Sequence, residues 1–215
     1  MNPFENIDAV LFDLDGTLVE TDIDFSLMRR EMWALAERHG ISTDEVQGLD
    51  ILAIIDFVVA RLNNAQIRQE AFQILEKIEM NHCRQAKLVP HAIELLEAIR
   101  LAGMKTGIVT RNCRNAVQIS MALTGITADV LLTRDDVPDT KPHPDHLLKA
   151  LEMLNVRPEN AIMVGDHRMD IQGGKAAGMK TVGFLRPGRP EDFFEPARPD
   201  IVIRDLGELL TRLRR

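Results

Sequence analysis

Two aspartates, Asp13 and Asp15, stand at the end of an apolar run and are followed by Gly16. The run, residues 7–13, predicts a strand that is buried on both faces. Proteins of the α/β class place their ligands and chemistry outside the carboxyl ends of parallel strands. A buried carboxylate is costly unless it is paired or binds a metal, so this pair points to catalysis or metal binding.

Polar residues also follow the other predicted strands. They are Thr110 with Arg111 and Asn112 after the second strand, Lys141 in a loop after the third, and Asp166 after the fourth. Asp170 lies one helical turn after Asp166, so both side chains can face one point. Because the ends of parallel strands meet at one edge of a sheet, we expect these groups to converge there.

The charge balance of such a site predicts what it binds. Up to four carboxylates would face one lysine, and two like charges 4 Å apart repel by about 4 kcal/mol at an effective dielectric constant of about 20. The site therefore needs a divalent cation, a shared proton, or both. Oxygen ligands favour Mg²⁺. Lys141, Thr110 and the amides of Arg111 and Asn112 can then hold the oxygens of a phosphate group.

Strands and helices alternate along most of the chain, which predicts a mainly parallel sheet flanked by helices. The predicted strands are 7–13, 105–110, 129–132, 160–165, 179–184 and 200–203; the predicted helices between and after them are 90–102, 113–124, 144–154, 169–177 and 205–213. Residues 24–86 are helical without strands. One helix there ends at His39-Gly40, a second begins at Ser42 and runs through Val59, and a third covers 65–83.

The predicted organisation is an α/β protein with a three-layer Rossmann-like core and an inserted all-helical cap. The core comprises residues 1–20 and 88–215, and the cap comprises residues 21–87. A chain of 215 residues is long enough for one sizeable core with such an insertion.

Composition narrows the functional classes. The net charge of −7 and the lack of a strong basic patch argue against nucleic-acid binding. No apolar stretch approaches the ~18 residues of a membrane helix, and no signal segment is expected. The two cysteines, Cys83 and Cys113, are too few for a disulfide framework, so we expect a cytoplasmic protein. We expect it to be a monomer or a homodimer.

Four motifs in order resemble those of the haloacid dehalogenase superfamily, in particular its phosphatases. They are Asp13-Leu14-Asp15-Gly16-Thr17, Thr110 closing Gly107-Ile108-Val109-Thr110, Lys141 in Lys-Pro-His-Pro, and Gly165-Asp166 with Asp170. The helical insertion and the segment 173–183 resemble the phosphoglycolate-phosphatase-like branch of that superfamily.

The resemblance implies a mechanism. Asp13 would be the nucleophile that forms an aspartyl-phosphate, and Asp15 the general acid and base. Mg²⁺ would be bound by Asp13, Asp166 and the backbone carbonyl of Asp15, and by Asp170 either directly or through a water molecule. Thr110, Lys141 and, next to them, Arg111 and Asn112 would bind the phosphate.

The resemblance also implies the substrate class, a small phosphorylated metabolite selected by the cap. The carboxylate at Asp15 argues against dehalogenation, because a halide leaving group needs no acid.

Simpler structural explanations exist for each residue alone. Asp13 and Asp15 could form a strand-end turn, and Thr110 could cap the next helix. Asp170 could be a first-turn carboxylate that the helix dipole stabilises. Arg111 could form an outward salt bridge. Arg186 and Arg189, in a proline-rich loop, are expected to be solvated, and His146 has no evident partner.

Three functions remain open at this stage. The first is a Mg²⁺-dependent phosphatase of small phosphate monoesters. The second is a phosphosugar mutase, which resembles it in all four motifs. The third, less favoured because the motif residues are all present, is a non-catalytic protein that binds a phosphorylated metabolite.

Overall fold

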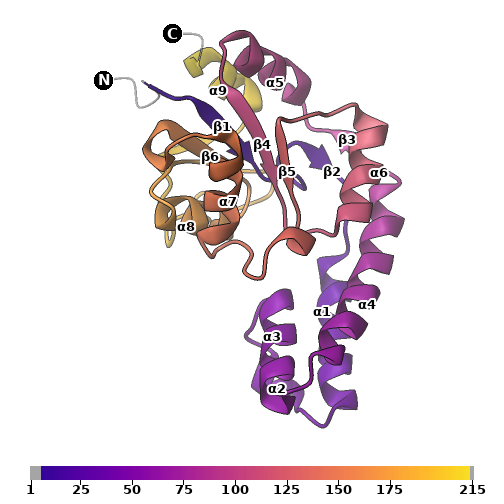
Figure 1. Ribbon diagram of the computed structural model, residues 1–215. Coiled ribbons are helices and arrows are strands. Elements are labelled where there is room, and N and C mark those ends of the chain that lie inside the picture. Colours follow the sequence, from indigo (N-terminus) through magenta and orange to yellow (C-terminus); the bar gives the residue numbers. More distant parts are fainter. Residues whose placement is uncertain (1–5, 214–215) are drawn as a thin grey trace. The chain divides into compact units, whose positions relative to one another are not determined.

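The computed structural model describes residues 6–213 and falls into two compact units (Figure 1). One unit comprises Met1–Thr21 with Ala86–Arg215, and the other comprises Asp22–Gln85. The first has the predicted α/β architecture, and the second is all-helical, as predicted for the insertion. The fold class expected from the sequence is confirmed.

A parallel sheet forms the centre of the α/β unit. In the described part of the chain it has six strands in the order β5-β4-β1-β6-β7-β8. The strands are β1 (Ala9–Phe12), β4 (Lys105–Val109), β5 (Val130–Leu132), β6 (Ala161–Gly165), β7 (Lys180–Phe184) and β8 (Ile201–Ile203). All six were predicted to within two residues of these bounds at either end. The prediction succeeds because β-branched and other apolar residues buried on both faces make continuous runs.

Helices cover both faces of this sheet, which gives three layers. Val10 and Phe12 of β1 belong to a core cluster with residues of α5 (Ala92–Leu101), α6 (Arg114–Thr124) and α9 (Leu206–Leu213). Ala9 and Leu11 point the other way, into a cluster with α7 (Asp145–Leu154). The remaining helix of this unit, α8 (Arg168–Ala176), lies on the same face of the sheet as α7. A Cβ added at Gly173 of α8 would be 3.4 Å from the side chain of Leu147.

Shorter elements complete the unit. A two-stranded antiparallel pair, β2 (Val19–Glu20) with β3 (Lys87–Leu88), joins the segments before and after the insertion. It was not predicted, because two residues cannot show an alternating pattern. Two 3₁₀ turns, η1 (Arg134–Asp136) and η2 (Pro158–Asn160), precede α7 and β6.

The helical unit corrects one prediction. Its helices are α1 (Phe25–Arg38), α2 (Thr43–Val46), α3 (Ile51–Leu62) and α4 (Gln66–Cys83). The single helix predicted from Ser42 through Val59 is wrong: it is two helices separated at 47–50. Asp50 begins the second by accepting hydrogen bonds from the backbone N–H groups of Leu52 and Ala53, at 3.1 and 3.5 Å. An N-cap carboxylate of this kind starts a new helix.

Among the described residues, every helix is too short or too polar to span a lipid bilayer.

Helix α5 offers a matched test of the core. Leu95 is fully buried, whereas Leu101 in the same helix is 81% exposed. Leu95→Ala is expected to lower the free energy of unfolding by about 2–5 kcal/mol, because it removes buried methyl groups and leaves a cavity. Leu101→Ala should change it by less than about 0.5 kcal/mol. Urea unfolding of both variants measures the difference; similar values would contradict the burial of α5 against the sheet.

Candidate active site

The ends of three neighbouring strands bring the predicted residues to one edge of the sheet. Asp13 follows β1, Thr110 follows β4 and Asp166 follows β6. In the register of the sheet, Phe12 of β1 lies opposite residues of both β4 and β6. The backbone N–H of Asp13 then donates to the carbonyl of Val164 at 2.9 Å. Extended pairing thus continues past the strand and fixes where the Asp13 side chain begins.

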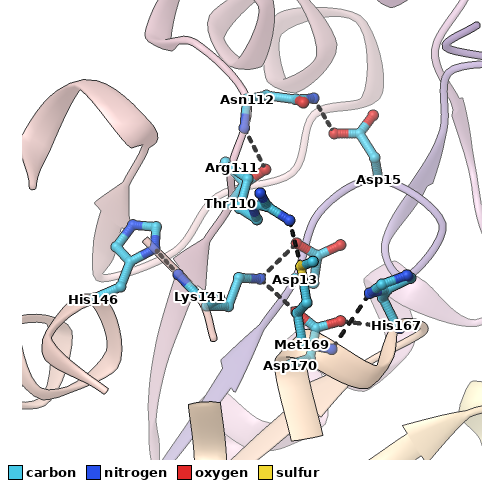
Figure 2. Close-up of polar contacts among 10 residues, drawn as sticks. All are labelled: Asp13, Asp15, Thr110, Arg111, Asn112, Lys141, His146, His167, Met169 and Asp170. Carbon is cyan, nitrogen blue, oxygen red and sulfur yellow. Dashed lines mark hydrogen bonds and ion pairs between the residues drawn. The ribbon is translucent and has the colours of Figure 1, made fainter. Parts of the chain in front are cut away.

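Three carboxylates and one ammonium group form the centre of the site, and Figure 2 shows the ammonium group of Lys141 with two of these carboxylates, Asp13 and Asp170. Asp13, Asp166 and Asp170 each offer an oxygen atom, and these atoms lie within 4.8 Å of one another. The Nζ of Lys141 donates to Oδ1 of Asp13 and to Oδ1 of Asp170, both at 2.7 Å. The Lys141 side chain is only 1% exposed, so this cation is committed to the two carboxylates.

Two glycines make room for the carboxylates. A Cβ added at Gly165 would lie 2.3 Å from Cγ of Asp170, and one added at Gly16 would lie 2.3 Å from Oδ2 of Asp166. Gly16 also has a φ of +85°, a left-handed conformation that side chains disfavour. The cluster can therefore close only because no side chain stands at these two positions.

Asp170 has two structural tasks. Its Oδ2 accepts the backbone N–H of His167 at 3.0 Å, within a capping box at the start of α8. Its Oδ1 accepts from Lys141. The simple explanation of Asp170 as a first-turn helix residue is thus correct, but the same side chain also belongs to the charged cluster.

Burial and mutual repulsion perturb the acids. Burial, with a contribution from the charge of Asp170, raises the pKa of Asp13 to about 6, although Lys141 opposes the shift. Burial and the charges of Asp13 and Asp170 raise the pKa of Asp166 well above its usual 3.8. Burial alone would lower the pKa of Lys141, but the two carboxylates beside it raise that pKa above 10.5. The cluster thus carries more negative charge than its lysine balances.

Asp15 lies in a different environment from Asp13. Its Oδ1 accepts from the hydroxyl of Thr21 at 2.5 Å, and its Oδ2 accepts from the side-chain amide of Asn112 (Figure 2). Its carboxylate is not one of the three that cluster. Thr21 was missed in the sequence, since a threonine six residues after the aspartate carries no motif signal.

The segment after β4 forms a compact turn. The hydroxyl of Thr110 accepts the backbone N–H of Asn112 at 3.2 Å. Thr110 does not cap the next helix, because the N-cap of α6 is Cys113. The guanidinium of Arg111 donates to the sulfur of Met169, which lies in the first turn of α8.

His146 supports Lys141 from behind. The backbone N–H of Lys141 donates to Nδ1 of His146 at 3.4 Å, and the imidazole is fully buried. Burial, together with the charge of Lys141, lowers the pKa of His146 to about 3, so the ring is a neutral acceptor near pH 7. No partner for His146 could be named from the sequence, because the contact depends on how the loop folds back onto α7.

The residues present suit a hard divalent cation. The cluster offers three carboxylate oxygens without nitrogen or sulfur ligands, the set that Mg²⁺ prefers. Burial and the charges of Asp13 and Asp170 make ionisation of Asp166 unfavourable, and a bound cation would oppose these effects. The resemblance to the superfamily also implies the backbone carbonyl of Asp15 as a ligand, and that assignment stays a prediction.

Asp166→Asn tests the raised pKa of Asp166. Because the pKa of Asp166 is raised on folding, the folded protein binds more protons than the unfolded chain, and stability falls as pH rises above about 3.8. Asparagine has no proton to lose in this pH range, so the variant does not lose stability in this way. In a chelator, the variant should melt at least about 2 °C above the wild type at pH 7, with the difference vanishing below pH 4.

The measurement is thermal unfolding between pH 4 and 8, with Asp139→Asn, a change at an exposed loop position, as the control. A difference that does not depend on pH would contradict the raised pKa.

Comparison with known proteins places the chain in a family. The family model described as haloacid dehalogenase-like hydrolase matches residues 10–184. Pyrophosphatase PpaX of Bacillus cereus (strain G9842) is 33% identical in an alignment of 213 positions that covers 95% of each chain. Pyrophosphatase PpaX of Bacillus mycoides (strain KBAB4) is 33% identical over 221 residues, covering 97% of this chain and 98% of its own.

Two solved structures match the fold of this chain. A HAD phosphatase from Thermococcus onnurineus is 31% identical and matches with a TM-score of 0.65, over 96% of this chain and 98% of that one. A predicted phosphoglycolate phosphatase from Haemophilus somnus 129PT, at 22% identity, shares the fold with a TM-score of 0.65 over 96% and 97% of the two chains. The resemblance read from the four motifs is thereby confirmed: the chain belongs to the haloacid dehalogenase-like hydrolases and is an enzyme of the phosphatase type.

Proposed function

We propose that this chain is a Mg²⁺-dependent phosphatase that hydrolyses small phosphate monoesters through an aspartyl-phosphate on Asp13. The observation that supports it best is the double contact of the buried Lys141 with Asp13 and Asp170, at 2.7 Å each, beside the third carboxylate of Asp166. A nucleophilic carboxylate, a fixed cation and a set of oxygen ligands for a metal are thus present at one point.

Asp13 would act as the nucleophile. Its side chain is 14% exposed, so an incoming phosphorus atom can reach it. A pKa of about 6 leaves most of the carboxylate ionised at pH 7, while making it more basic than an ordinary aspartate. An oxygen of Asp13 would attack phosphorus as the ester oxygen departs, which forms the phospho-enzyme.

Asp15 would move the protons. It would protonate the departing alkoxide, and later accept a proton from the water that hydrolyses the aspartyl-phosphate. The donors that hold its two oxygens, Thr21 and Asn112, are neutral. The hydroxyl of Thr21 can donate to the ionised carboxylate and accept from the protonated form, so this contact is compatible with both states.

Asp13, Asp166 and Asp170 would hold Mg²⁺, with the carbonyl of Asp15 as the further ligand implied by the family. The bound cation would reduce the repulsion between the anionic carboxylate and the anionic phosphate. Lys141 and the turn after β4 would contact the phosphoryl oxygens. In that turn the hydroxyl of Thr110, the backbone amide of Arg111 and the amides of Asn112 are the candidate donors.

The substrate is proposed as a small phosphorylated metabolite. The curated relatives at 33% identity are named pyrophosphatases, which favours inorganic pyrophosphate as a second candidate substrate for the same site. The transfer of a phosphoryl group to Asp13 is the same step in both cases, and only the leaving group changes. A cap role for residues 21–87, a cytoplasmic location and the oligomeric state stay predictions.

Asp13→Asn is expected to lower phosphate release by at least about a thousandfold, because an amide oxygen cannot serve as the nucleophile. The assay follows inorganic phosphate from a panel of monoesters and from pyrophosphate, with Mg²⁺ and without a bisphosphate primer. Asp8→Asn is the control, since Asp8 is exposed and lies at the other end of β1.

Turnover by Asp13→Asn near the wild-type rate would remove Asp13 from the nucleophilic role. Wild-type activity that requires a bisphosphate primer would favour the mutase, and no activity across the panel would favour the binding protein.

Removal of metal is expected to abolish turnover reversibly. Incubation with EDTA should reduce phosphate release to background, and Mg²⁺ in excess should restore it, because three carboxylates otherwise repel the phosphate. Ca²⁺, which takes more ligands at longer distances, should restore much less. Full activity in the presence of the chelator would contradict the metal role of the cluster.

A further inference from the structure

The positive charges are shared unequally among the three clustered carboxylates. Lys141 contacts Asp13 and Asp170 at 2.7 Å, but makes no such contact with Asp166. Within residues 6–213, the ion-pair partner of Asp166 is Arg186, whose NH1 lies 3.9 Å from Oδ2. Asp166 is therefore the carboxylate with the least direct compensation, and Arg186 is the cation positioned to supply more.

Arg186 reaches the site from the loop that follows β7. The expectation that it is simply solvated is wrong, because its side chain is only 35% exposed and two acids contact it. Its NH1 would lie 3.0 Å from a Cβ at Gly16, the glycine that also admits Asp166. The guanidinium thus occupies the space beside the Asp13–Gly16 turn, next to a proposed metal ligand.

Glu20 holds the other side of the same guanidinium. Its Oε1 is 3.2 Å from NH2 of Arg186, closer than the 3.9 Å that separates NH1 from Asp166. Glu20 lies in the short strand β2, which is paired with β3 and so has a fixed backbone. The arginine is therefore shared between two acids, and the nearer one draws it away from the cluster.

The sharing has a direct electrostatic consequence. An arginine is charged at every accessible pH, so it competes with any other cation for the same carboxylate. The closer Arg186 comes to Asp166, the weaker the binding of a divalent ion must be. Glu20 opposes that approach.

We propose that Glu20 and Arg186 together tune the Mg²⁺ affinity of the cluster: Arg186 competes with the ion for Asp166, and Glu20 restrains Arg186. Both are positioning residues, since neither is needed as a ligand. The inference rests on the proposed Mg²⁺ site, and it assigns a role to two residues outside the four motifs.

The proposal makes the two single substitutions act in opposite directions. R186M removes the competing cation while keeping a side chain of similar length, and should tighten Mg²⁺ binding about threefold to tenfold, a range that allows for the partial exposure of the pair. E20Q frees the arginine to approach Asp166, and should weaken binding by a similar factor.

A double-mutant cycle separates this role from a simple charge effect. Glu20 is itself an anion near the site, and its loss alone could weaken Mg²⁺ binding. If Glu20 acts through Arg186, then E20Q should have less than about a twofold effect in the R186M background. R186K keeps the charge and should stay close to the wild type.

The experiment is calorimetric titration of the metal-free protein with MgCl₂ alone, which needs no substrate and no turnover. E191Q and R204M are matched controls, because Glu191 and Arg204 form an exposed ion pair in the same unit. Thermal unfolding of each variant verifies that it is folded. The expected result is tightening by R186M, weakening by E20Q and little further change in the double variant.

Several results would overturn the proposal. If the R186M substitution leaves the Mg²⁺ affinity unchanged but raises KM for a phosphoester, Arg186 is a substrate contact instead. E20Q that weakens binding equally with and without Arg186 would make Glu20 an independent anion. If the wild-type protein binds no Mg²⁺, the proposed metal site itself is wrong. If it binds Mg²⁺ and neither substitution changes the affinity, only this inference is wrong.

Discussion

The active site depends on one buried lysine. Lys141 is 1% exposed and donates to Asp13 and Asp170, while Asp166 stands beside them without a contact of that kind. Removing a charged amine from water is costly, and only well-placed anions can compensate for it. The lysine and the two aspartates therefore stabilise one another, but one ammonium group balances only one of the three carboxylates when all are ionised. The remaining negative charge supports the proposed site for a divalent cation.

Backbone geometry makes this charge arrangement possible. The sheet places three strand ends side by side, and the absence of side chains at Gly16 and Gly165 lets Asp166 and Asp170 approach. A helix capping box then fixes Asp170, and His146 contacts the backbone of Lys141. Asp170 and Lys141 are thus each held in part by a neutral contact that does not compete for the charge.

The sequence predicted the parts of this arrangement that repeat a local pattern. The strands of the sheet are continuous apolar runs, and Gly165-Asp166 ends one of them, so strand ends and their polar residues could be located in advance. The break between α2 and α3 was missed because apolar spacing continues across it, although Asp50 carries a capping signal.

Contacts made by residues outside the four motifs could not be predicted. Arg186 is separated by 166 residues from Glu20, and nothing in its proline-rich loop marks it as part of the site. His146 and Thr21 were missed for the same physical reason. Their roles arise from where loops return, and not from the periodicity of the elements that carry them.

The two aspartates of the first motif show how environment divides similar groups. Asp13 and Asp15 are two residues apart, yet Asp13 contacts a buried ammonium group, whereas Asp15 accepts from the hydroxyl of Thr21 and the side-chain amide of Asn112. A strand directs alternate side chains to the same face, but β1 ends at Phe12, and the chain then turns so that the carbonyl of Leu14 accepts from the backbone N–H groups of Leu18 and Val19. The alternation of a strand therefore does not extend to Asp13 and Asp15. The proposed roles, attack on phosphorus by Asp13 and proton transfer by Asp15, match this difference in environment. Separate environments for two carboxylates are how acid and nucleophile roles are divided in general, and here the end of β1 and the turn after it place the two side chains differently.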